Sequence, residues 1–484
     1  MENVSNIKKN TIFNTLKTVF GIIYPLITFP YISRVLLTDN VGKINFGNSI
    51  VSYVTLVASL GVNTYAIREC SKVKYDKNEL SKISSQILSI NIISSLVAYV
   101  ALAIVLIFAR PLENYRLLII IQSTSVLFTT LGADWLNTAM EDFKFIAVRT
   151  ICMQIAALLL MFIFIHKPED YMIYAVISVV ASSGANVVNI FYRKKYCKTG
   201  FTLKMNAKKH LPRILLLFSL ILSQTIYVNS DITILGLIKG DHEVGLYSTS
   251  VKMYTIINTT IASIAWVVMP KLSLHFQQKN YSEINRLLKY ALNYILVLGI
   301  PCVCGLEVIA PHLIILIAGE AYVDATISLR ILGVAMMCSF IAGWIGNMTR
   351  IPAGRENVSL RISVISACIN IILNLILIPK FGLNAAALTT AVSECFGMIC
   401  GLILIDRKIK IDELSNMLIG PISGGVGIVL IGIASQLLFS KTWIITIVTV
   451  FVSVIWYFAV MLITKNEFFA SFIKPIIFKI IRRE

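Results

Sequence analysis

The stretch TIFNTLKTVFGIIYPLITFPYIS, residues 11–33, has the length and composition of a helix that crosses a lipid bilayer. About twenty mostly apolar residues are enough for an α-helix to span the hydrocarbon core. Polar residues nevertheless recur along this stretch at steps of three and four, and Arg34 follows it directly. In lipid, such a polar stripe must face protein or water. The stretch therefore predicts a membrane-spanning helix with one polar side.

The whole chain has the same apolar character. Of its 484 residues, 57% are apolar and 14% are charged, and the mean hydropathy is +0.80. Soluble domains contain only about 45–50% apolar residues, so this composition predicts an all-α membrane protein with about 14 transmembrane helices. The apolar runs are centred near Ile22, Leu56, Leu96, Ser125, Ala156, Val179, Ser223, Thr259, Val297, Cys338, Ile371, Ser393, Val426 and Val452.

The formal charge of +18 is mainly a topology signal. With the N-terminus inside, most Lys and Arg residues fall in segments on the inner side, which is the positive-inside pattern. This predicts a multi-pass protein of the cell membrane with both termini in the cytoplasm, and it requires no nucleic-acid partner. The nine cysteines are scattered. Cys302 and Cys304 point away from each other on a helix, so no metal site is expected.

An internal repeat organises the spans. At an offset of 203 residues Tyr24 matches Tyr227, Thr28 matches Asp231, and Val41-Gly42 matches Val244-Gly245. Six spans per repeat place both copies the same way up, as in many transporters. We therefore expect a six-helix lobe at 1–205, a second at 206–410 and a central cavity between them. Residues 411–484 should form two additional helices and a basic cytoplasmic tail.

Six segments carry a resemblance to a known family. They are PYISRVL (30–36), SLGVNTYAIRE (59–69), GADWLNTAMEDFKFIAVR (132–149), SDITILGLIKGDHEVGLYSTSVKMY (230–254), PAGREN (352–357) and NIILNLILIPKFGLNAAALTTAVSE (370–394). In this order they resemble the polysaccharide flippases of the multidrug/oligosaccharidyl-lipid/polysaccharide exporter superfamily. Two residues depart from the family pattern. Leu37 and Asn384 stand where the family often has glycine.

The resemblance implies a transporter and not an enzyme. Such a flippase moves oligosaccharide repeat units linked to undecaprenyl pyrophosphate from the cytoplasmic to the outer leaflet, by alternating access of the two lobes. The product would be O-antigen, capsule or exopolysaccharide. The expected partners are the lipid-linked substrate, membrane lipids, and the polymerase and glycosyltransferases of the pathway. No cofactor is expected, and a proton or sodium gradient is the candidate energy source.

A pyrophosphate-linked glycan needs cations for its anion and polar groups for its sugars. The expected cavity cations, on or beside polar stripes, are Lys17, Arg34, Arg68, Arg149 and Lys252. Arginine suits phosphate because its planar fork can donate two hydrogen bonds at once. The polar residues expected to line the cavity are Asn14, Tyr24, Thr28, Asn48, Ser52, Thr55 and Tyr227.

These cations need not bind substrate, and the sequence leaves the alternatives open. Lys17 could extend to the cytoplasmic interface. Arg68 and Arg149 lie at cytoplasmic helix ends, where topology alone accounts for them. Arg149 could also form a structural ion pair with an acidic residue between 134 and 142. Arg34 could sit at the outer lipid interface against headgroup phosphates.

Asp231 and Lys252 are equidistant from the turn between two spans, so they should lie at equal depth. Charges deep in a membrane usually pair, which predicts a salt bridge between them. The alternative is that Asp231 is a proton- or sodium-coupling carboxylate. Glu394 is the other candidate for that coupling role.

Three other functions remain as alternatives. A cation-coupled multidrug antiporter of the same superfamily would need an acidic cavity. A flippase for the lipid II-type peptidoglycan precursor would also suit fourteen spans. A membrane-bound glycosyltransferase or polymerase ranks lowest, because every predicted outward connection is short and holds no catalytic loop.

Overall fold

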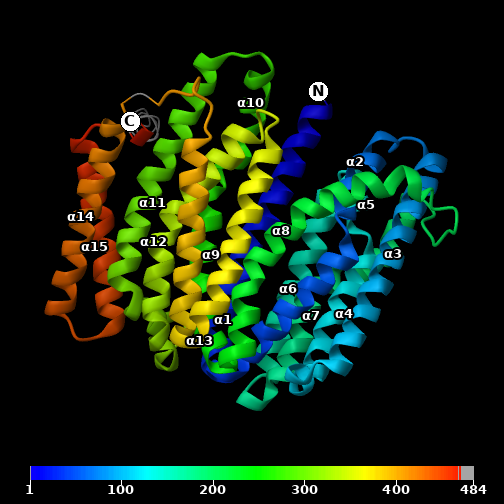
Figure 1. Ribbon diagram of the computed structural model, residues 1–484, viewed down its shortest axis with the longest axis horizontal. Helices are drawn as coiled ribbons and strands as arrows, with labels where there is room; N and C mark the ends of the chain where they lie inside the picture. The colour runs from blue at the N-terminus through cyan, green and yellow to red at the C-terminus, as the bar shows by residue number, and fades with distance from the viewer. Residues whose placement is uncertain (1, 412, 467, 470–484) are drawn as a thin grey trace. The chain divides into compact units, whose positions relative to one another are not determined.

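The computed structural model describes residues 2–411, 413–466 and 468–469, and over these residues the chain is helical with no strand (Figure 1). It divides into two compact units, Met1–Gly245 and Leu246–Glu484. Each unit is described separately. The lobe boundaries expected from the sequence were placed from the internal repeat, whereas these two units are defined by contacts within the chain. The expected boundaries stay predictions. The predicted basic tail falls mainly on residues 470–484, outside the described residues.

Unit 1 is built from eight α-helices among its described residues. They are α1 (Glu2–Ser59), α2 (Val62–Lys72), α3 (Lys77–Phe108), α4 (Arg116–Gly132), α5 (Asp134–Ala139), α6 (Phe143–Phe164), α7 (Tyr171–Tyr192) and α8 (Ala207–Lys239). Short 3-10 helices η1 (Arg110–Tyr115), η2 (Pro168–Asp170) and η3 (Arg193–Lys195) lie between them. The two halves of α1 pack against α3, α4, α6 and α8.

Unit 2 begins within α9 (Asp241–Ala262). It continues with α10 (Ile264–Gln277), α11 (Tyr281–Ile317), 3-10 helix η4 (Glu320–Ala325), α12 (Thr326–Gly343), π-helix η5 (Trp344–Arg350), α13 (Glu356–Ile403), α14 (Leu414–Leu438) and α15 (Thr442–Ile463). The helices α14 and α15 pack against each other and against α11. Both lie within residues 411–484, and their assignment as an additional pair after a second lobe stays a prediction.

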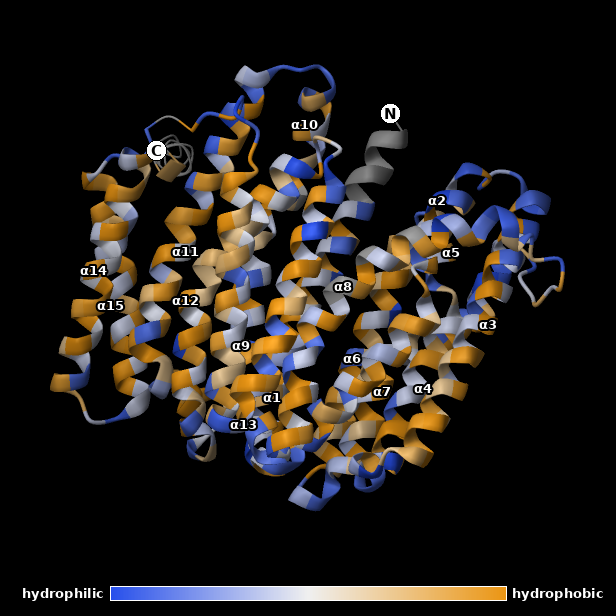
Figure 2. Cartoon of the chain, in the orientation of Figure 1, coloured by the Kyte–Doolittle hydropathy of each residue, from blue (hydrophilic) through white to orange (hydrophobic). Residues whose placement is uncertain are grey.

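The predicted spans are confirmed as helices, because every predicted centre lies inside one. Among the described residues, ten stretches are long and apolar enough to cross a membrane, or eleven if α9 and α10 form one bent span. Their apolar bodies and polar ends are visible in Figure 2. Both α1 and α13 contain a residue with non-helical dihedral angles, Leu37 and Gly382, so each holds two helical segments. The count of fourteen stays a prediction.

The prolines of α11 explain one arginine within a span. Proline removes the helical hydrogen bond to the carbonyl four residues earlier. For Pro301 that carbonyl belongs to Val297, and the hydroxyl of Tyr457 from α15 donates to it at 2.7 Å. For Pro311 it belongs to Glu307, and Nε of Arg330 donates to it at 3.0 Å. Arg330 therefore satisfies backbone that proline leaves unpaired, and Tyr457 fixes α15 to α11.

The break in α1 occurs at the residue where the sequence departs from the family pattern. Leu37 has φ 62° and ψ 177°, a region of backbone conformation that is essentially restricted to glycine. Gly240, 203 residues later, has φ 88° and ψ −171°, which is the same conformation. The repeat detected in the sequence is therefore matched in backbone geometry. In the first copy a leucine adopts the conformation that glycine adopts in the second.

Replacing Leu37 by glycine should stabilise unit 1. Such a conformation costs a non-glycine residue about 1–3 kcal/mol, whereas the extra freedom of glycine in the unfolded chain costs about 0.5–1 kcal/mol. We expect Leu37→Gly to raise the midpoint of thermal unfolding of the detergent-solubilised chain. Leu16→Gly is the matched control, because Leu16 lies in a helical part of α1, and it should lower the midpoint. A lower midpoint for Leu37→Gly would contradict the prediction.

Candidate functional site

Unit 1 contains a partly open polar cavity of about 570 Å³. Its wall comes from all eight helices of the unit, α1 to α8. The polar lining includes Asn14, Lys17, Thr55, Asn91, Asp134 and Asn186. A soluble protein could leave such a space to bulk water. Inside helices of membrane length, a polar cavity is a site for a polar group that must cross the bilayer.

Lining groups are held in place by hydrogen bonds to helix backbone. The Thr55 hydroxyl donates to the carbonyl of Val51 at 2.9 Å, a back-bond within α1. The Asn91 amide of α3 donates to the carbonyl of Ala58 at 2.8 Å, which ties α3 to α1. Each of these groups keeps an oxygen that can accept a further hydrogen bond. The cavity can therefore accept hydrogen bonds from hydroxyl-rich ligands without rearranging its wall.

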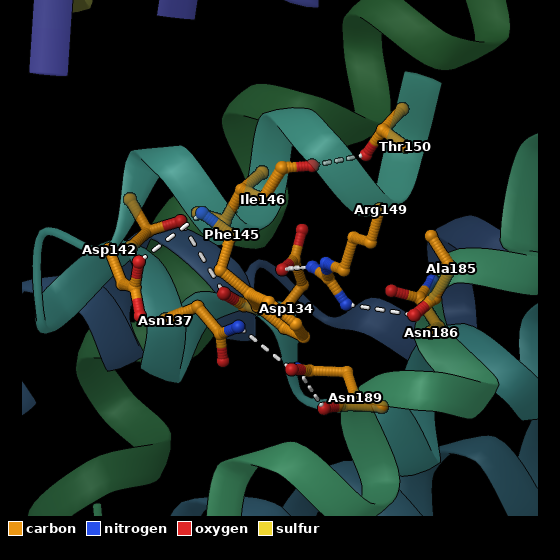
Figure 3. Close-up of polar contacts among 12 residues, drawn as sticks. Asp134, Asn137, Asp142, Phe145, Ile146, Arg149, Thr150, Ala185, Asn186 and Asn189 are labelled. Atoms are coloured by element: carbon orange, nitrogen blue, oxygen red, sulfur yellow. Dashed lines mark hydrogen bonds and ion pairs between the residues drawn. The ribbon is translucent and has the colours of Figure 1, made fainter. Parts of the chain in front are cut away.

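Arg149 adjoins the cavity through Asp134, a lining residue with which it forms an ion pair (Figure 3). Its Nη2 pairs with Oδ1 of Asp134, and its Nη1 donates to the carbonyl of Ala185 on α7 at 2.9 Å. The face of the Phe145 ring lies 5.3 Å from the guanidinium carbon. The Arg149 side chain is 4% exposed, whereas that of Asp134 is 36% exposed and lines the cavity. The structural ion pair considered for Arg149 is therefore present, and its acidic member faces the cavity.

The turn between α4 and α5 brings Asp134 to this place. Ala133 adopts the left-handed conformation, with φ 49° and ψ 51°, and it ends α4. The Asn189 amide from α7 donates to the carbonyl of Gly132 at 2.7 Å. The Asn137 amide donates to Oδ1 of Asn189 at 2.7 Å (Figure 3). Because Asn137 and Asn189 are fully buried, these bonds hold the turn firmly against α7.

Asp142 fixes the start of α6, the helix that carries Arg149. Its carboxylate accepts hydrogen bonds from the hydroxyls of Tyr192 and Tyr196, both at 2.8 Å, and from the Phe145 N–H at 3.2 Å. Burial alone would raise the pKa of Asp142, but these hydrogen bonds outweigh it and hold the pKa below its usual range. Asp142 therefore stays ionised at neutral pH and caps α6.

The structure brings some of the predicted site residues together. Asn14, Lys17 and Thr55 line the cavity, and Arg149 adjoins it through Asp134. The charges of Lys17 and Arg149 are close enough to interact. The role of these residues in binding substrate stays a prediction.

Other predicted residues lie elsewhere. Arg34 is exposed and donates to the carbonyl of Pro30 at 2.7 Å, and Arg68 is exposed on α2; neither lines this cavity. The remaining predicted polar residues of unit 1 are also outside its lining: Tyr24, Thr28, Asn48, Ser52 and Tyr227. Asp231 is buried in unit 1, and Lys252 and Glu394 belong to unit 2. Their salt bridge and coupling roles stay predictions.

Apart from Asn14, the asparagines of the cavity and its wall were not predicted from the sequence, and neither was Asp134 as a lining residue. Asn186 and Asn189 are three residues apart on the largely apolar α7, so they share one helix face. That spacing is the signal that could have identified them. Asn91 stands in a serine-rich part of α3 and carried no comparable signal.

Comparisons with known proteins agree on a family and a fold. The family model described as "Polysaccharide biosynthesis protein" matches residues 7–275. A "Putative O-antigen transporter" of Shigella dysenteriae is 22% identical over 380 residues, which cover 78% of this chain and 94% of that protein. The "Capsular polysaccharide biosynthesis protein CapF" of Staphylococcus aureus is 26% identical over 360 residues, covering 72% and 87%.

Two solved structures share the fold. One is described as the lipid II flippase MurJ in an inward closed conformation; it superposes with a TM-score of 0.76 at 16% identity, covering 96% of this chain and 100% of that chain. The other is an inward-facing MATE family multidrug resistance transporter, with a TM-score of 0.56 at 14% identity, covering 80% and 93%. The family resemblance recognised in the sequence is confirmed. Because the family model matches more than half of its residues, the chain belongs to the polysaccharide biosynthesis protein family.

Proposed function

We propose that this protein is a membrane transporter that flips a lipid-linked oligosaccharide during the biosynthesis of a surface polysaccharide. The observation that carries the proposal is the polar cavity of unit 1, which holds Lys17 and borders Arg149 within helices of membrane length. The names of the relatives, a putative O-antigen transporter and a capsular polysaccharide biosynthesis protein, support the same class of cargo.

The finer assignment follows from the chemistry of such a cargo. Its head carries sugar hydroxyls and a phosphate anion, and neither can cross about 30 Å of hydrocarbon unaided. Lys17 and Arg149 would attract the anion, and Thr55 and Asn91 would accept hydrogen bonds from sugars. We propose undecaprenyl pyrophosphate as the carrier and alternating access as the mechanism, with both termini in the cytoplasm. No bond is made or broken, so the protein acts as a transporter and not as an enzyme.

The charge of the cavity argues against a drug-cation antiporter. Asp134 is the one acidic residue in the lining of this cavity among the described residues, and it is paired with Arg149. Lys17 therefore leaves the site with a net positive charge, which favours an anionic cargo. A lipid II-type precursor is also anionic, so only experiment separates it from an oligosaccharide repeat unit.

Deleting the gene in its own host should remove a surface polysaccharide and leave its lipid-linked repeat unit in the cytoplasmic leaflet. A Lys17→Ala copy should restore less than about a tenth of the polysaccharide, because one charged contact to the anion is worth about 1.5–3 kcal/mol. The matched control is Lys82→Ala, which removes an exposed lysine paired with Glu79. Surface polysaccharide would be quantified at equal protein levels. Intact polysaccharide in the deletion host, with impaired peptidoglycan synthesis or drug resistance instead, would contradict the proposal.

A further inference from the structure

We infer that Asp134 is a displaceable counter-ion, and that an anionic group of the cargo takes its place at Arg149. The group is a phosphate of the lipid carrier or a carboxylate of an acidic sugar. Asp134 would return to Arg149 when the cargo leaves. This inference rests on the proposed function and adds a specific mechanism of anion capture and release to it.

The first support is that Arg149 is held in place without Asp134. The bond to the Ala185 carbonyl fixes Nη1, and the Phe145 ring covers one face of the guanidinium. With the side chain 4% exposed, little freedom remains. If the carboxylate moves away, the guanidinium keeps its position and presents Nη2 to whatever replaces it. A fixed arginine fork is well suited to bind phosphate or carboxylate.

The second support is that Asp134 is free to leave. Among the described residues, its carboxylate makes one polar contact, which is the ion pair with Arg149. The side chain is 36% exposed and lines the cavity, so water can solvate it after displacement. By contrast, the carboxylate of Asp142 in the next turn accepts three hydrogen bonds and lies outside the cavity lining. Only Asp134 combines a single partner with access to the cavity.

The third support is a surplus of hydrogen-bond donors around the pair. Nε of Arg149 and Nε1 of Trp135 are buried and have no hydrogen-bond partner among the described residues. Trp135 lines the cavity beside Asp134. Lys17, whose charge interacts with that of Arg149, adds a second cation. The cavity and its edge thus hold two cations and one carboxylate, so a phosphate with several acceptor oxygens can satisfy groups that Asp134 leaves unpaired.

Arg350 in unit 2 is held differently from Arg149, although its Nε is likewise buried with no hydrogen-bond partner among the described residues. It is buried, and its Nη2 donates to the carbonyls of Gly401 at 2.9 Å and Cys400 at 3.5 Å, at the end of α13. Backbone carbonyls cannot leave when an anion arrives, and a cation near a helix C-terminus is stabilising. The pairing of Arg149 with a cavity-facing carboxylate is a different arrangement, and it allows exchange.

The inference is tested by anion titration of the purified full chain. Inorganic pyrophosphate and, separately, glucuronate would be titrated calorimetrically into wild type, Asp134→Asn, Asp134→Glu and Glu141→Gln. Asp134→Asn removes the competing charge and should tighten binding of one anion about tenfold to a hundredfold. Asp134→Glu keeps the charge and should tighten anion binding less than Asp134→Asn does. Glu141→Gln is the matched control, because Glu141 forms an ion pair with Lys74, with a distance of 2.7 Å between Nζ and Oε1. Glu141 does not line the cavity.

The pattern of affinities identifies the source of the anion. Tighter binding of pyrophosphate alone indicates the phosphate of the lipid carrier, and tighter binding of glucuronate alone indicates an acidic sugar. Equal or weaker binding of both anions by Asp134→Asn, with a thermal midpoint showing that it is folded, overturns the inference. If Asp134→Asn is unfolded, Asp134→Ser is titrated in its place under the same criteria.

Transport supplies a second readout that a structural role would not change. Asp134 promotes release of the anion because it competes with the anion for Arg149. Asp134→Asn should therefore lower both KM and turnover for export. A structural defect would lower only the amount of active protein. An unchanged KM overturns the inference. The two proposals fail separately. Tighter anion binding by Asp134→Asn, together with intact polysaccharide in the deletion host, would reject the function and leave the exchange site in place.

Discussion

Gly42→Ala should abolish export and destabilise the protein, although it adds only one methyl group. A Cβ atom at Gly42 would lie 1.8 Å from the carbonyl oxygen of Asp241 and 3.0 Å from the backbone nitrogen of Gly245. Both atoms belong to backbone, so no side-chain rotation can relieve the clash. Overpacked cores lose about 1–3 kcal/mol even where side chains can move. Here the loss should exceed that range.

The close contact of Gly42 with the Asp241 carbonyl has a counterpart at Gly245. A Cβ atom at Gly245 would lie 2.1 Å from the carbonyl oxygen of Thr38. Thr38 and Asp241 are 203 residues apart, as are Gly42 and Gly245. Equivalent segments of the two repeats therefore cross each other, and each contributes one glycine and one carbonyl. The carboxylate of Asp39 and the ring of His242, related by the same offset, are 2.8 Å apart.

Folded protein in the membrane and the thermal midpoint would be measured for Gly42→Ala, Gly245→Ala and a control. The control is Gly21→Ala, also on α1, where an added Cβ meets no atom within 4 Å. A helical glycine replaced by alanine at an open position should gain about 0.5–1 kcal/mol. Gly42→Ala and Gly245→Ala should therefore fail while Gly21→Ala equals or exceeds wild type. Normal folding of Gly42→Ala would show that the crossing is looser than the structure places it.

This crossing shows what a sequence can reveal about such a fold. The repeat offset was found from matched residues, including Val41-Gly42 and Val244-Gly245, and the same offset relates the breaks at Leu37 and Gly240. That the matched glycines touch each other could not be found in this way. Periodicity describes one helix at a time, and it contains no information about which faces of distant helices meet.

Only part of the polar stripe expected in the first span lines the cavity of unit 1. Asn14 and Lys17 line the cavity, but Tyr24 and Thr28, further along the same stripe, do not. The stripe was extended on the geometry of a straight helix, whereas α1 contains Pro25 and Pro30, which disturb a regular helix. Helix phase, and with it the face that a residue occupies, cannot be carried across such positions from sequence alone.

Asp134 illustrates a second limit. It is fifteen residues from Arg149, and neither helical nor strand spacing brings such residues together. The left-handed conformation of Ala133 and the buried bond from Asn189 to Gly132 create the contact. The sequence does not indicate a left-handed residue at position 133, because alanine rarely adopts that conformation. The acidic residues near Arg149 could be identified from the sequence, but the one that pairs with it could not.

Arg149→Ala should cause the largest loss of export among the cation variants. The substitution leaves Asp134 without its partner at the edge of the cavity, and breaking a buried ion pair costs about 3–5 kcal/mol. Because Asp134 is about one-third exposed, we expect the lower end of that range. Lys144→Ala is the control on α6, since Lys144 is exposed, and it should keep normal export. Arg149→Lys keeps the charge but not the fork, and it should keep part of the export.

The double variant Asp134→Ala/Arg149→Ala separates a structural pair from an anion-binding one. Removing both charges relieves the unpaired carboxylate, so the thermal midpoint should return toward that of wild type. Export should stay lost, because the guanidinium that receives the anion is absent. Surface polysaccharide and thermal midpoint would be measured for both single variants and the double variant. If the double variant recovers export together with stability, Arg149 serves only to hold α6 against α5 and α7. The anion must then bind elsewhere in the cavity, where Lys17 is the remaining cation of the lining among the described residues.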